Sequence, residues 1–283
     1  MKLFTFITTA LSLTFLVSAA TFSNPLKPKD GSDPHIVYTG GYYYLMTTTW
    51  TNLQITRATT LEGLKNGETK VVWTDSTASR CCNIWAPELH YFDGLWYIYY
   101  TAGTSADLNG QRPNVLKGGA TPFDSYSHLA TLMNTWGIDG SILRTTSANY
   151  FVYSCFSSAG LQSLCIAPLN SPGSVGATTC ERLLDRQVPA LLTWNGGNPT
   201  QASSWAKTGP FLTSANGNYG VGSQWGPDGT EVWNVYHADA NSAGACDGTR
   251  YTMAQKVNWN SDNTPNFGSP GALGTQITGP SGE

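Results

Sequence analysis

The chain has 283 residues, and only 12% of them are Asp, Glu, Lys or Arg, about half the share in an average soluble protein. The formal net charge of −3 excludes the excess of Lys and Arg with which proteins usually bind nucleic acid. Tyrosine (14) and tryptophan (10) are abundant instead, which suits a neutral ligand with flat apolar faces, such as a sugar.

The N-terminus has the pattern of an export signal. Lys2 is followed by an almost wholly apolar or small stretch, Leu3–Val17, and by the small residues Ser18-Ala19-Ala20. We expect residues 1–20 to be a signal peptide, the protein to be secreted, and residues 21–283 to form a single domain. The alternative is a buried N-terminal helix. The stretch is too short to span a bilayer, and we expect no membrane partner.

Six cysteines in an exported chain suggest disulfides. Cys155 and Cys165 flank a short loop and could bridge a hairpin, while Cys81 and Cys82 are adjacent and could form a vicinal disulfide. The connectivity stays open at this level. No pair of cysteines or histidines has the spacing of a zinc site, so we predict no metal.

A repeated pattern runs along the chain, in which a turn rich in Gly, Asn or Asp precedes an alternating aromatic strand. The expected strands are residues 42–49, 95–103, 150–158 and 230–238. Intervals of 53 and 55 residues separate the first three turns, at Gly40, Asp93 and Ala148. Repeats of roughly this length with several strands each are typical of propeller blades.

The repeat is interrupted in the next interval. From Ala148 to Asp228 is 80 residues, too long for one period and too short for two. Inside it, residues 180–190 (CERLLDRQVPA) break the strand pattern with charges and a leucine pair. Two interpretations stay open: part of a blade is missing, or a short surface helix covers a blade.

Isolated acids within apolar strands are the candidates for chemistry, because glycosidases usually work with two carboxyl groups. Asp33 opens a predicted strand, Asp139 lies between a glycine and an apolar run, and Glu88 follows Trp85 in an aromatic segment. Each Asp could instead be a turn residue, and Trp85 could be a stacking platform for sugar or ordinary core.

Four segments resemble glycoside hydrolase family 43, and within it the fungal secreted arabinofuranosidases. In chain order they are DPHIVYTGGYYYL (33–45), IWAPELHYFDGLWYIYYTA (84–102), GIDGSILR (137–144) and WNVYHADANSAGACDGTRYTMAQKV (233–257). The resemblance implies an all-β, five-bladed β-propeller with one blade incomplete in this chain. It also implies an axial active site and hydrolysis of α-L-arabinofuranosyl linkages with inversion.

The same resemblance implies roles for individual residues. Asp33 matches the general base that activates water, and Asp139 matches the acid that raises the pKa of the proton donor and orients it. Arg250 matches an arginine near the substrate or the donor carboxylate. We expect Trp85 and Glu88 to contact substrate as well.

The chain departs from the family pattern at the proton donor, a glutamate in a Glu-Gly-Pro context. That context should fall between Thr179 and Leu191, where the repeat is short and Glu181 is the sole glutamate. The general acid is therefore not identified, with Glu181 as a weak candidate. Without a donor, aryl glycosides should react slowly and polymeric arabinan hardly at all.

A second departure concerns the propeller axis. Family members carry a Gly-His-Asn whose histidine faces an axial water or metal ion, and Ser223-Gln224 stands in its place here. We therefore expect no cofactor, and the axial calcium possible in the family is in doubt for this chain.

The sequence thus predicts an extracellular glycosidase of the α-L-arabinofuranosidase type that acts on arabinan or arabinoxylan. Its expected partner is a plant cell-wall polysaccharide or oligosaccharide, and the expected state is a monomer. Two alternatives remain: a catalytically dead or crippled propeller that only binds carbohydrate, and an arabinanase or xylosidase on the same fold.

Overall fold

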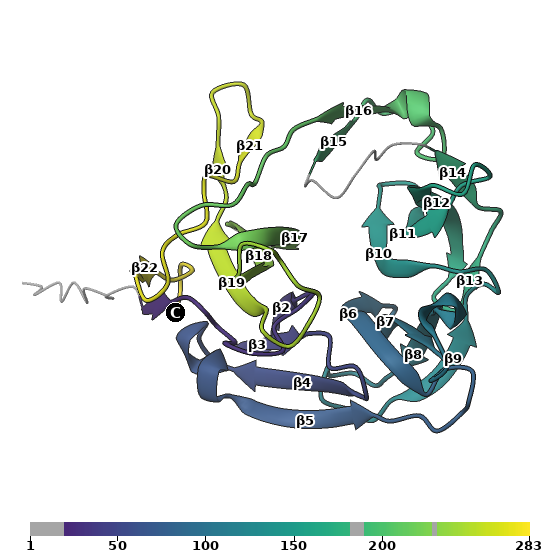
Figure 1. Ribbon diagram of the computed structural model, residues 1–283, viewed down its shortest axis with the longest axis horizontal. Helices are drawn as coiled ribbons and strands as arrows, with labels where there is room; N and C mark the ends of the chain where they lie inside the picture. The colour runs from purple at the N-terminus through teal and green to yellow at the C-terminus, as the bar shows by residue number, and fades with distance from the viewer. Residues whose placement is uncertain (1–19, 182–189, 228–230) are drawn as a thin grey trace, which may run out of the picture.

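Small antiparallel sheets stand around a central axis, so the chain is an all-β protein with the arrangement of a β-propeller (Figure 1). The structure is a computed structural model, and it describes residues 20–181, 190–227 and 231–283. Helical structure in this part consists of three short 3-10 turns, η1 (Glu62–Asn66), η2 (Leu108–Gly110) and η3 (Ala202–Ser204).

Three sheets of four or more strands follow one another along the chain. The first contains β2 (His35–Thr39), β3 (Tyr42–Met46), β4 (Leu53–Ala58) and β5 (Glu68–Trp73). The second contains β6 (Cys82–Phe92), β7 (Leu95–Gly103), β8 (Arg112–Lys117) and β9 (Ser127–Thr131). The third contains β10 (Ile138–Arg144), β11 (Asn149–Phe156), β12 (Gln162–Ser171), β13 (Ser174–Val175) and β14 (Thr179–Glu181), of which β13 and β14 both pair with β12.

The remaining sheets have only two or three strands each. The strands β15 (Leu191–Trp194) and β16 (Trp205–Thr208) form a two-stranded ribbon. The last sheet has the three strands β17 (Tyr219–Pro227), β18 (Val232–Asp239) and β19 (Tyr251–Lys256). A separate short hairpin of β20 (Asn258–Trp259) and β21 (Pro265–Asn266) follows it.

The number of blades differs from the prediction. The described residues form four blades of three or more strands, so the predicted count of five is wrong. The β15–β16 ribbon spans the arc between the third and the last blade, where another full blade was expected (Figure 1). The reason lies in chain length, because too few residues separate β14 from β17 to supply a four-stranded sheet with its connections.

The aromatic strands of the repeat are confirmed at three of the four predicted hairpins. The turns at Gly40-Gly41 and Asp93-Gly94 have positive φ at every residue, from 47° to 86°, as two-residue hairpins require. β10 and β11 meet at a turn that ends at Ala148. The fourth predicted turn, at residues 228 and 229, lies outside the described residues, although the strand after it is present as β18.

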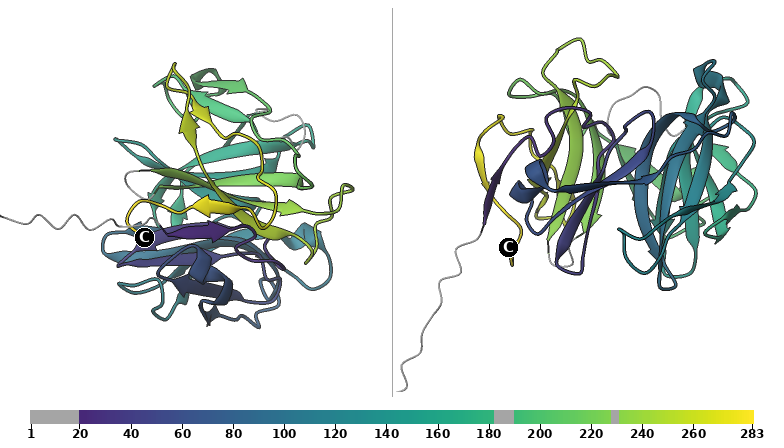
Figure 2. Two further views of the ribbon diagram at one scale, coloured as in Figure 1. Left: turned by 90° about the vertical axis from the view of Figure 1, so that its left-hand side faces the viewer. Right: turned by 90° about the horizontal axis from the view of Figure 1, so that it is seen from below.

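The two ends of the described chain meet and close the ring. β1 (Thr21–Ser23) pairs with β22 (Gln276–Thr278), and the segment after β1 continues along β19 through a bridge between Lys27 and Thr252. The side views in Figure 2 show the purple N-terminal strand beside the yellow C-terminal segment. The residues predicted as a signal peptide lie outside the described part, apart from Ala20.

The hydrophobic core is divided among the interfaces between blades. One cluster joins the first blade to the second, with Met46 and Ile55 against Leu89 and Ile98. Others join the second blade to the third and the first blade to the last, and a fourth lies under the last blade. None of these four clusters includes a residue of the β15–β16 ribbon. The ribbon is thus the least packed part of the described ring.

Both of the disulfides that the sequence suggested are present. Cys81 and Cys82 form a vicinal disulfide, and a bridge between Cys155 and Cys165 links β11 to β12. Within the described residues there is no helix whose length and apolar character would let it cross a bilayer.

Candidate active site

The first strands of the four blades, β17, β2, β6 and β10, lie nearest the axis and contact one another in that order (Figure 1). Three acidic side chains come from these strands or the loops beside them, and one arginine precedes the third strand of the last blade. They are Asp33 before β2, Glu88 on β6, Asp139 on β10 and Arg250 before β19. The charges of the other three all act on Asp139, so the structure brings the four residues together.

Asp33 is held in place by its neighbours. The Thr48 hydroxyl donates a hydrogen bond of 2.6 Å to Asp33 Oδ2, and the side chain keeps 25% of its surface exposed. Its φ of +50° is a left-handed conformation that non-glycine residues rarely adopt. Just before it, a Cβ on Gly31 would collide with the backbone of β19, so only glycine allows this close approach. Such local strain is typical of functional sites.

His237 on β18 orients the backbone of Asp33, and sequence reasoning had missed it. The backbone N–H of Asp33 donates to His237 Nδ1 at 3.1 Å. Burial lowers the pKa of His237 to about 4, against the opposing charge of Asp33 and with the help of Arg250. The imidazole is therefore neutral. A signal did exist, because the chain has only four histidines and three of them, His35, His90 and His237, lie at this site.

Asp139 lies where β10 leaves regular pairing with β11, since the register breaks between Ile138 and Ser141. Its φ is +56°, and more than a third of the residue is accessible to solvent. Protein atoms nevertheless crowd the carboxyl. This desolvation, followed by the negative charges of Asp33 and Glu88, raises the pKa of Asp139 to about 7, while Arg250 opposes the rise.

Glu88 is the centre of a buried polar network rather than an open group. It is 3% exposed, and its Oε2 lies 2.8 Å from His90 Nε2. Burial alone would raise the pKa of Glu88, but the His90 hydrogen bond, the charges of His35 and His90, and a hydrogen bond from Ser141 lower it overall. Glu88 is thus ionised at neutral pH. It has almost no surface to offer to a ligand, although we expected it to contact substrate.

The side chains of His35, Glu88 and His90 lie close enough together to be considered as a metal site, with ligand atoms within 4.8 Å of one another. The donor set does not fit one. His35 Nδ1 accepts the backbone N–H of Leu89 at 3.3 Å, so the proton of this neutral imidazole is on Nε2 and that nitrogen has no lone pair to give. His90 Nε2 is already bound to Glu88. These contacts make the group a hydrogen-bonded network.

An aromatic pair lies close in the chain to Thr48 and Ala86, which hydrogen bonds link to Asp33. Trp50 and Trp85 pack edge to face with ring centroids 5.5 Å apart, and backbone hydrogen bonds link Trp50 to Ile84. Trp50 was not among the predicted site residues. The Nε1 of Trp85 is buried and has no hydrogen-bond partner among the described residues. Bound water or a ligand can supply the missing hydrogen-bond acceptor.

Arg250 is tied to the site by its backbone and its charge. Its carbonyl oxygen accepts the N–H of Gly31 at 2.9 Å, two residues before Asp33. Its guanidinium donates to Cys246 Sγ at 3.0 Å and is partly exposed. Through its charge it acts on Asp139 and His237.

The positions linked to the proton donor fall mostly outside the described residues. Residues 182–189, in the junction where the donor was expected, are not described, and neither is the side chain of Glu181. The backbone of Glu181 pairs with Leu164 on β12, two strands away from the axial strand β10. The side chains of Ser223 and Gln224 are likewise outside the described part, so the axial ion position is not tested.

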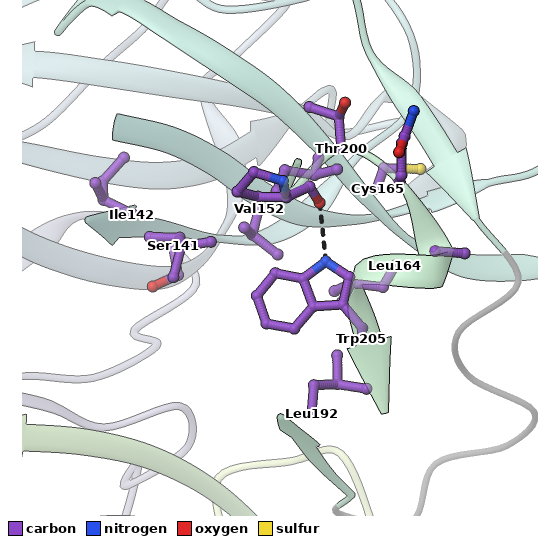
Figure 3. A pocket seen from close by; sticks show the side chains of 13 residues that line it. Ser141, Ile142, Val152, Leu164, Cys165, Leu192, Thr200 and Trp205 are labelled. Carbon is purple, nitrogen blue, oxygen red and sulfur yellow. Dashed lines mark hydrogen bonds between the residues drawn. The ribbon is translucent and has the colours of Figure 1, made fainter. Parts of the chain in front are cut away.

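A largely apolar cavity of about 380 Å³ separates the third blade from the ribbon (Figure 3). The blade contributes Ile142, Val152 and Leu164, and the ribbon contributes Leu192 and Trp205. In Figure 3 the Trp205 ring lies below the blade with its N–H bonded to the carbonyl of Pro199, a bond of 2.9 Å. The face of the third blade is therefore only loosely covered, which agrees with a shortage of strands at this arc.

The chain is similar to one family of known proteins. The model for "Glycosyl hydrolases family 43" matches residues 22–220. An "Extracellular exo-alpha-(1->5)-L-arabinofuranosidase" of Streptomyces avermitilis is 29% identical, with 96% of this chain and 70% of the relative covered. "Alpha-L-arabinofuranosidase 43" of Humicola insolens is 28% identical, with 94% of this chain and 68% of the relative covered.

Among solved structures, an α-L-arabinofuranosidase from Lactobacillus brevis superposes with a TM-score of 0.79 at 24% identity. The superposition covers 90% of this chain and 98% of that one, and it supports the fold. The alignment with the Streptomyces relative extends over 340 residues, more than the 283 of this chain. That relative therefore carries residues that have no counterpart here.

Proposed function

Because the chain belongs to glycosyl hydrolase family 43, we propose that it is an α-L-arabinofuranosidase that hydrolyses terminal arabinofuranosyl linkages in arabinan or arabinoxylan with inversion. The activities named for the Streptomyces and Humicola relatives support this substrate class. Its natural partner is then a plant cell-wall polysaccharide or oligosaccharide.

The observation that carries the proposal is the pair Asp33 and Asp139 at the axial ends of two blades. Each lies in a left-handed conformation and is partly open to solvent, and the charge of Asp33 raises the pKa of Asp139. Asp33, held by Thr48, is the general base that takes a proton from the attacking water. Asp139 is the second acid of the site, and Arg250 helps to set its charge.

Substrate contacts follow from the surroundings of Asp33. Trp85, with Trp50 against its edge, supplies an apolar wall for one face of the sugar ring. Arg250 supplies hydrogen-bond donors on another side. Glu88 acts indirectly, because burial and the bond to His90 keep it from the substrate while its charge reaches Asp139.

We interpret the β15–β16 ribbon as the place in the ring from which the segment with the family's donor glutamate is absent. The longer alignments with both relatives, over 340 and 335 residues, support this interpretation. The cavity behind the ribbon supports it as well.

The test is the release of arabinose from 4-nitrophenyl α-L-arabinofuranoside and from α-1,5-linked arabino-oligosaccharides. The matching β-D-xylopyranoside tests for the xylosidase alternative, and cleavage of internal bonds in linear arabinan tests for an arabinanase. Proton NMR of the first product formed reports whether the anomeric configuration is inverted. Failure to release arabinose from either arabinoside would refute the proposal.

A carbohydrate-binding propeller without catalysis is the second candidate, and the thin β15–β16 ribbon is the observation that favours it. Calorimetric binding of arabino-oligosaccharides in the absence of any hydrolysis would identify this case.

We also propose that the protein is secreted and that it is a monomer. The word "extracellular" in the name of the Streptomyces relative and the composition of residues 1–20 support secretion. N-terminal sequencing of the secreted protein should begin at Thr21, and light scattering should give the mass of a single chain.

A further inference from the structure

Two aromatic rings form an exposed pair at one end of the third blade. Trp136 lies in the β9–β10 loop and Phe156 at the end of β11, and their ring centroids are 4.4 Å apart. Phe156 is 51% exposed, and Leu108 in η2 and Leu161 in the β11–β12 loop are 52% and 45% exposed. Exposed apolar side chains that gather in one patch mark a binding surface more often than single ones do. We call Trp136 and Phe156 the rim platform.

Hydrogen bonds fix the rim platform to the second blade. The Trp136 N–H donates to the carbonyl oxygen of Leu108 at 3.1 Å. The backbone N–H of Gly137 donates to the carbonyl oxygen of the buried Gln111 at 3.3 Å, and the Gln111 amide donates to the carbonyl oxygen of Asn83 on β6 at 2.9 Å. The one donor of the indole is thus satisfied by the protein, and what the side chain offers to a ligand is its apolar ring. A ring held in this way loses little conformational freedom when a ligand binds.

The rim platform and the candidate active site lie at the same end of the ring. The inner strands β2, β6 and β10 contact one another in that order, and Asp33 and Asp139 lie where β2 and β10 start. Trp136 comes three residues before Asp139, and three residues of fully extended chain span at most about 11 Å. A sugar chain that leaves the axial site over the third blade therefore passes the platform.

The loops around the rim platform favour an uncharged ligand. Residues 104–111, 132–137 and 157–161 include a single charged residue, Asp107, and their other polar residues are Ser, Thr, Asn and Gln. Hydroxyl and amide groups both donate to and accept from the hydroxyl groups of a sugar, while an aromatic ring covers its apolar face. A partner recognised mainly through its charge finds little to bind here.

We propose that Trp136 and Phe156 form a subsite for the main chain of the polysaccharide, on the leaving-group side of the bond that is cut. The inference rests on the proposed function, because a terminal arabinofuranosyl unit in the axial site leaves the rest of the polymer to run out over the rim. The ligand is a chain of neutral pentose units, either the α-1,5-linked arabinose of arabinan or the β-1,4-linked xylose of arabinoxylan.

Calorimetric titration with arabinobiose, arabinopentaose and xylopentaose tests the inference. Trp136→Ala should raise the Kd of the pentasaccharide that the wild type binds by about tenfold and the Kd of arabinobiose much less, because only the longer chain reaches the platform. Phe156→Ala should act in the same direction, and Trp136→Phe, which keeps a ring, should retain most of the affinity. The pentasaccharide that binds the wild type more tightly distinguishes arabinan from arabinoxylan as the source of the chain.

Tyr91→Ala is the matched control. Tyr91 is 49% exposed and packs against Trp96 with ring centroids 5.2 Å apart, but it lies beside the β6–β7 turn, at the other end of the inner strand. Its Kd values for all three sugars should match those of the wild type. Circular dichroism and the melting temperature establish that each variant is folded, and Phe156→Ala removes a ring that is half exposed and so carries the test if Trp136→Ala does not fold.

Four results would overturn the inference. They are unchanged affinity for both pentasaccharides in the folded platform variants, an equal loss of affinity for the disaccharide and the pentasaccharide, a wild type that binds neither pentasaccharide, and a dimer in light scattering that Phe156→Ala abolishes. The last result would make the platform a contact between two copies of this chain.

Hydrolysis of 4-nitrophenyl α-L-arabinofuranoside by the wild type decides the proposed function separately. Hydrolysis without any effect of the platform variants on binding refutes only the subsite. A platform effect on binding in a protein that cleaves no arabinofuranoside refutes only the hydrolase and leaves a propeller that binds the polysaccharide chain.

Discussion

The hydroxyl of Thr48 joins the Asp33 carboxylate to the next blade. It donates to Asp33 Oδ2 at 2.6 Å and accepts the backbone N–H of Ala86 at 2.8 Å. Thr48 follows β3 in the first blade and Ala86 lies on β6 of the second, so one side chain fixes the base relative to both. Ala86 itself has a φ of +44°, which places its N–H on an unusual part of the backbone.

Thr48→Val should lower kcat/KM for 4-nitrophenyl α-L-arabinofuranoside by about tenfold or more. A hydrogen bond to a charged group contributes roughly 1.5–3 kcal/mol, and the variant also leaves the Ala86 N–H without its acceptor. Thr48→Ser keeps the hydroxyl and should retain most of the activity. Full activity in Thr48→Val, which keeps the methyl group and loses the hydroxyl, would show that the hydrogen bond does not matter.

Asp33→Asn should lower kcat for the same substrate by about 10²–10⁴, because the amide cannot accept a proton from water. Binding of arabino-oligosaccharide should change little, since Asn has the same shape. Steady-state kinetics and calorimetry measure the two effects separately. Loss of binding together with activity would assign Asp33 to sugar recognition instead of water activation.

The raised pKa of Asp139 predicts a cost in stability at neutral pH. The ordinary pKa of an Asp is about 3.9. Between that pH and about 7 the folded protein therefore binds more protons than the unfolded chain. Stability from this group is thus present at low pH and is lost as the pH rises through the window. Asp139→Asn should melt at a higher temperature than the wild type at pH 8, with a smaller difference at pH 4.

Comparing the wild type with Asp139→Asn at each pH cancels the contributions that His35 and His237 make to the free energy of unfolding. Burial lowers the pKa of each of these histidines, which makes both proteins less stable in acid. Differential scanning calorimetry at several pH values gives the comparison. A melting difference that does not depend on pH would contradict the raised pKa.

The cavity between the third blade and the ribbon should accept added volume. Val152 lines it, so Val152→Ile should leave the melting temperature unchanged or raise it, because cavity-filling changes commonly add about 0.5–2 kcal/mol. Val115→Ile is the matched control in the filled interface of the second and third blades, where it is fully buried. Overpacking there should cost about 1–3 kcal/mol. Equal destabilisation by both would mean that the cavity is closed in solution.

Much of the fold could be predicted because it depends on local chemistry. Turn residues such as Gly40-Gly41 and Asp93-Gly94 take positive φ, and the alternating aromatic segments after them have the period of a strand, so β3 and β7 appear where the repeat placed them. The regular spacing of these turns indicated a propeller, because each blade repeats the same set of strands. The sequence also showed the shortage of residues after Ala148, but it did not give the correct number of blades.

The sequence by itself determined the β-propeller, its hairpins, and the candidates Asp33 and Asp139, because strand period, turn chemistry and isolated charge are properties of neighbouring residues. Only the tertiary structure decided the surroundings of those candidates. Thr48 and His237 reach Asp33 from 15 and 204 positions away, and Glu88 proved to be buried against His90. The proton state of Asp139 depends on Asp33, Glu88 and Arg250, which come from three other parts of the chain. Electrostatic and hydrogen-bond energies depend on distance in space, and the ring of blades sets those distances.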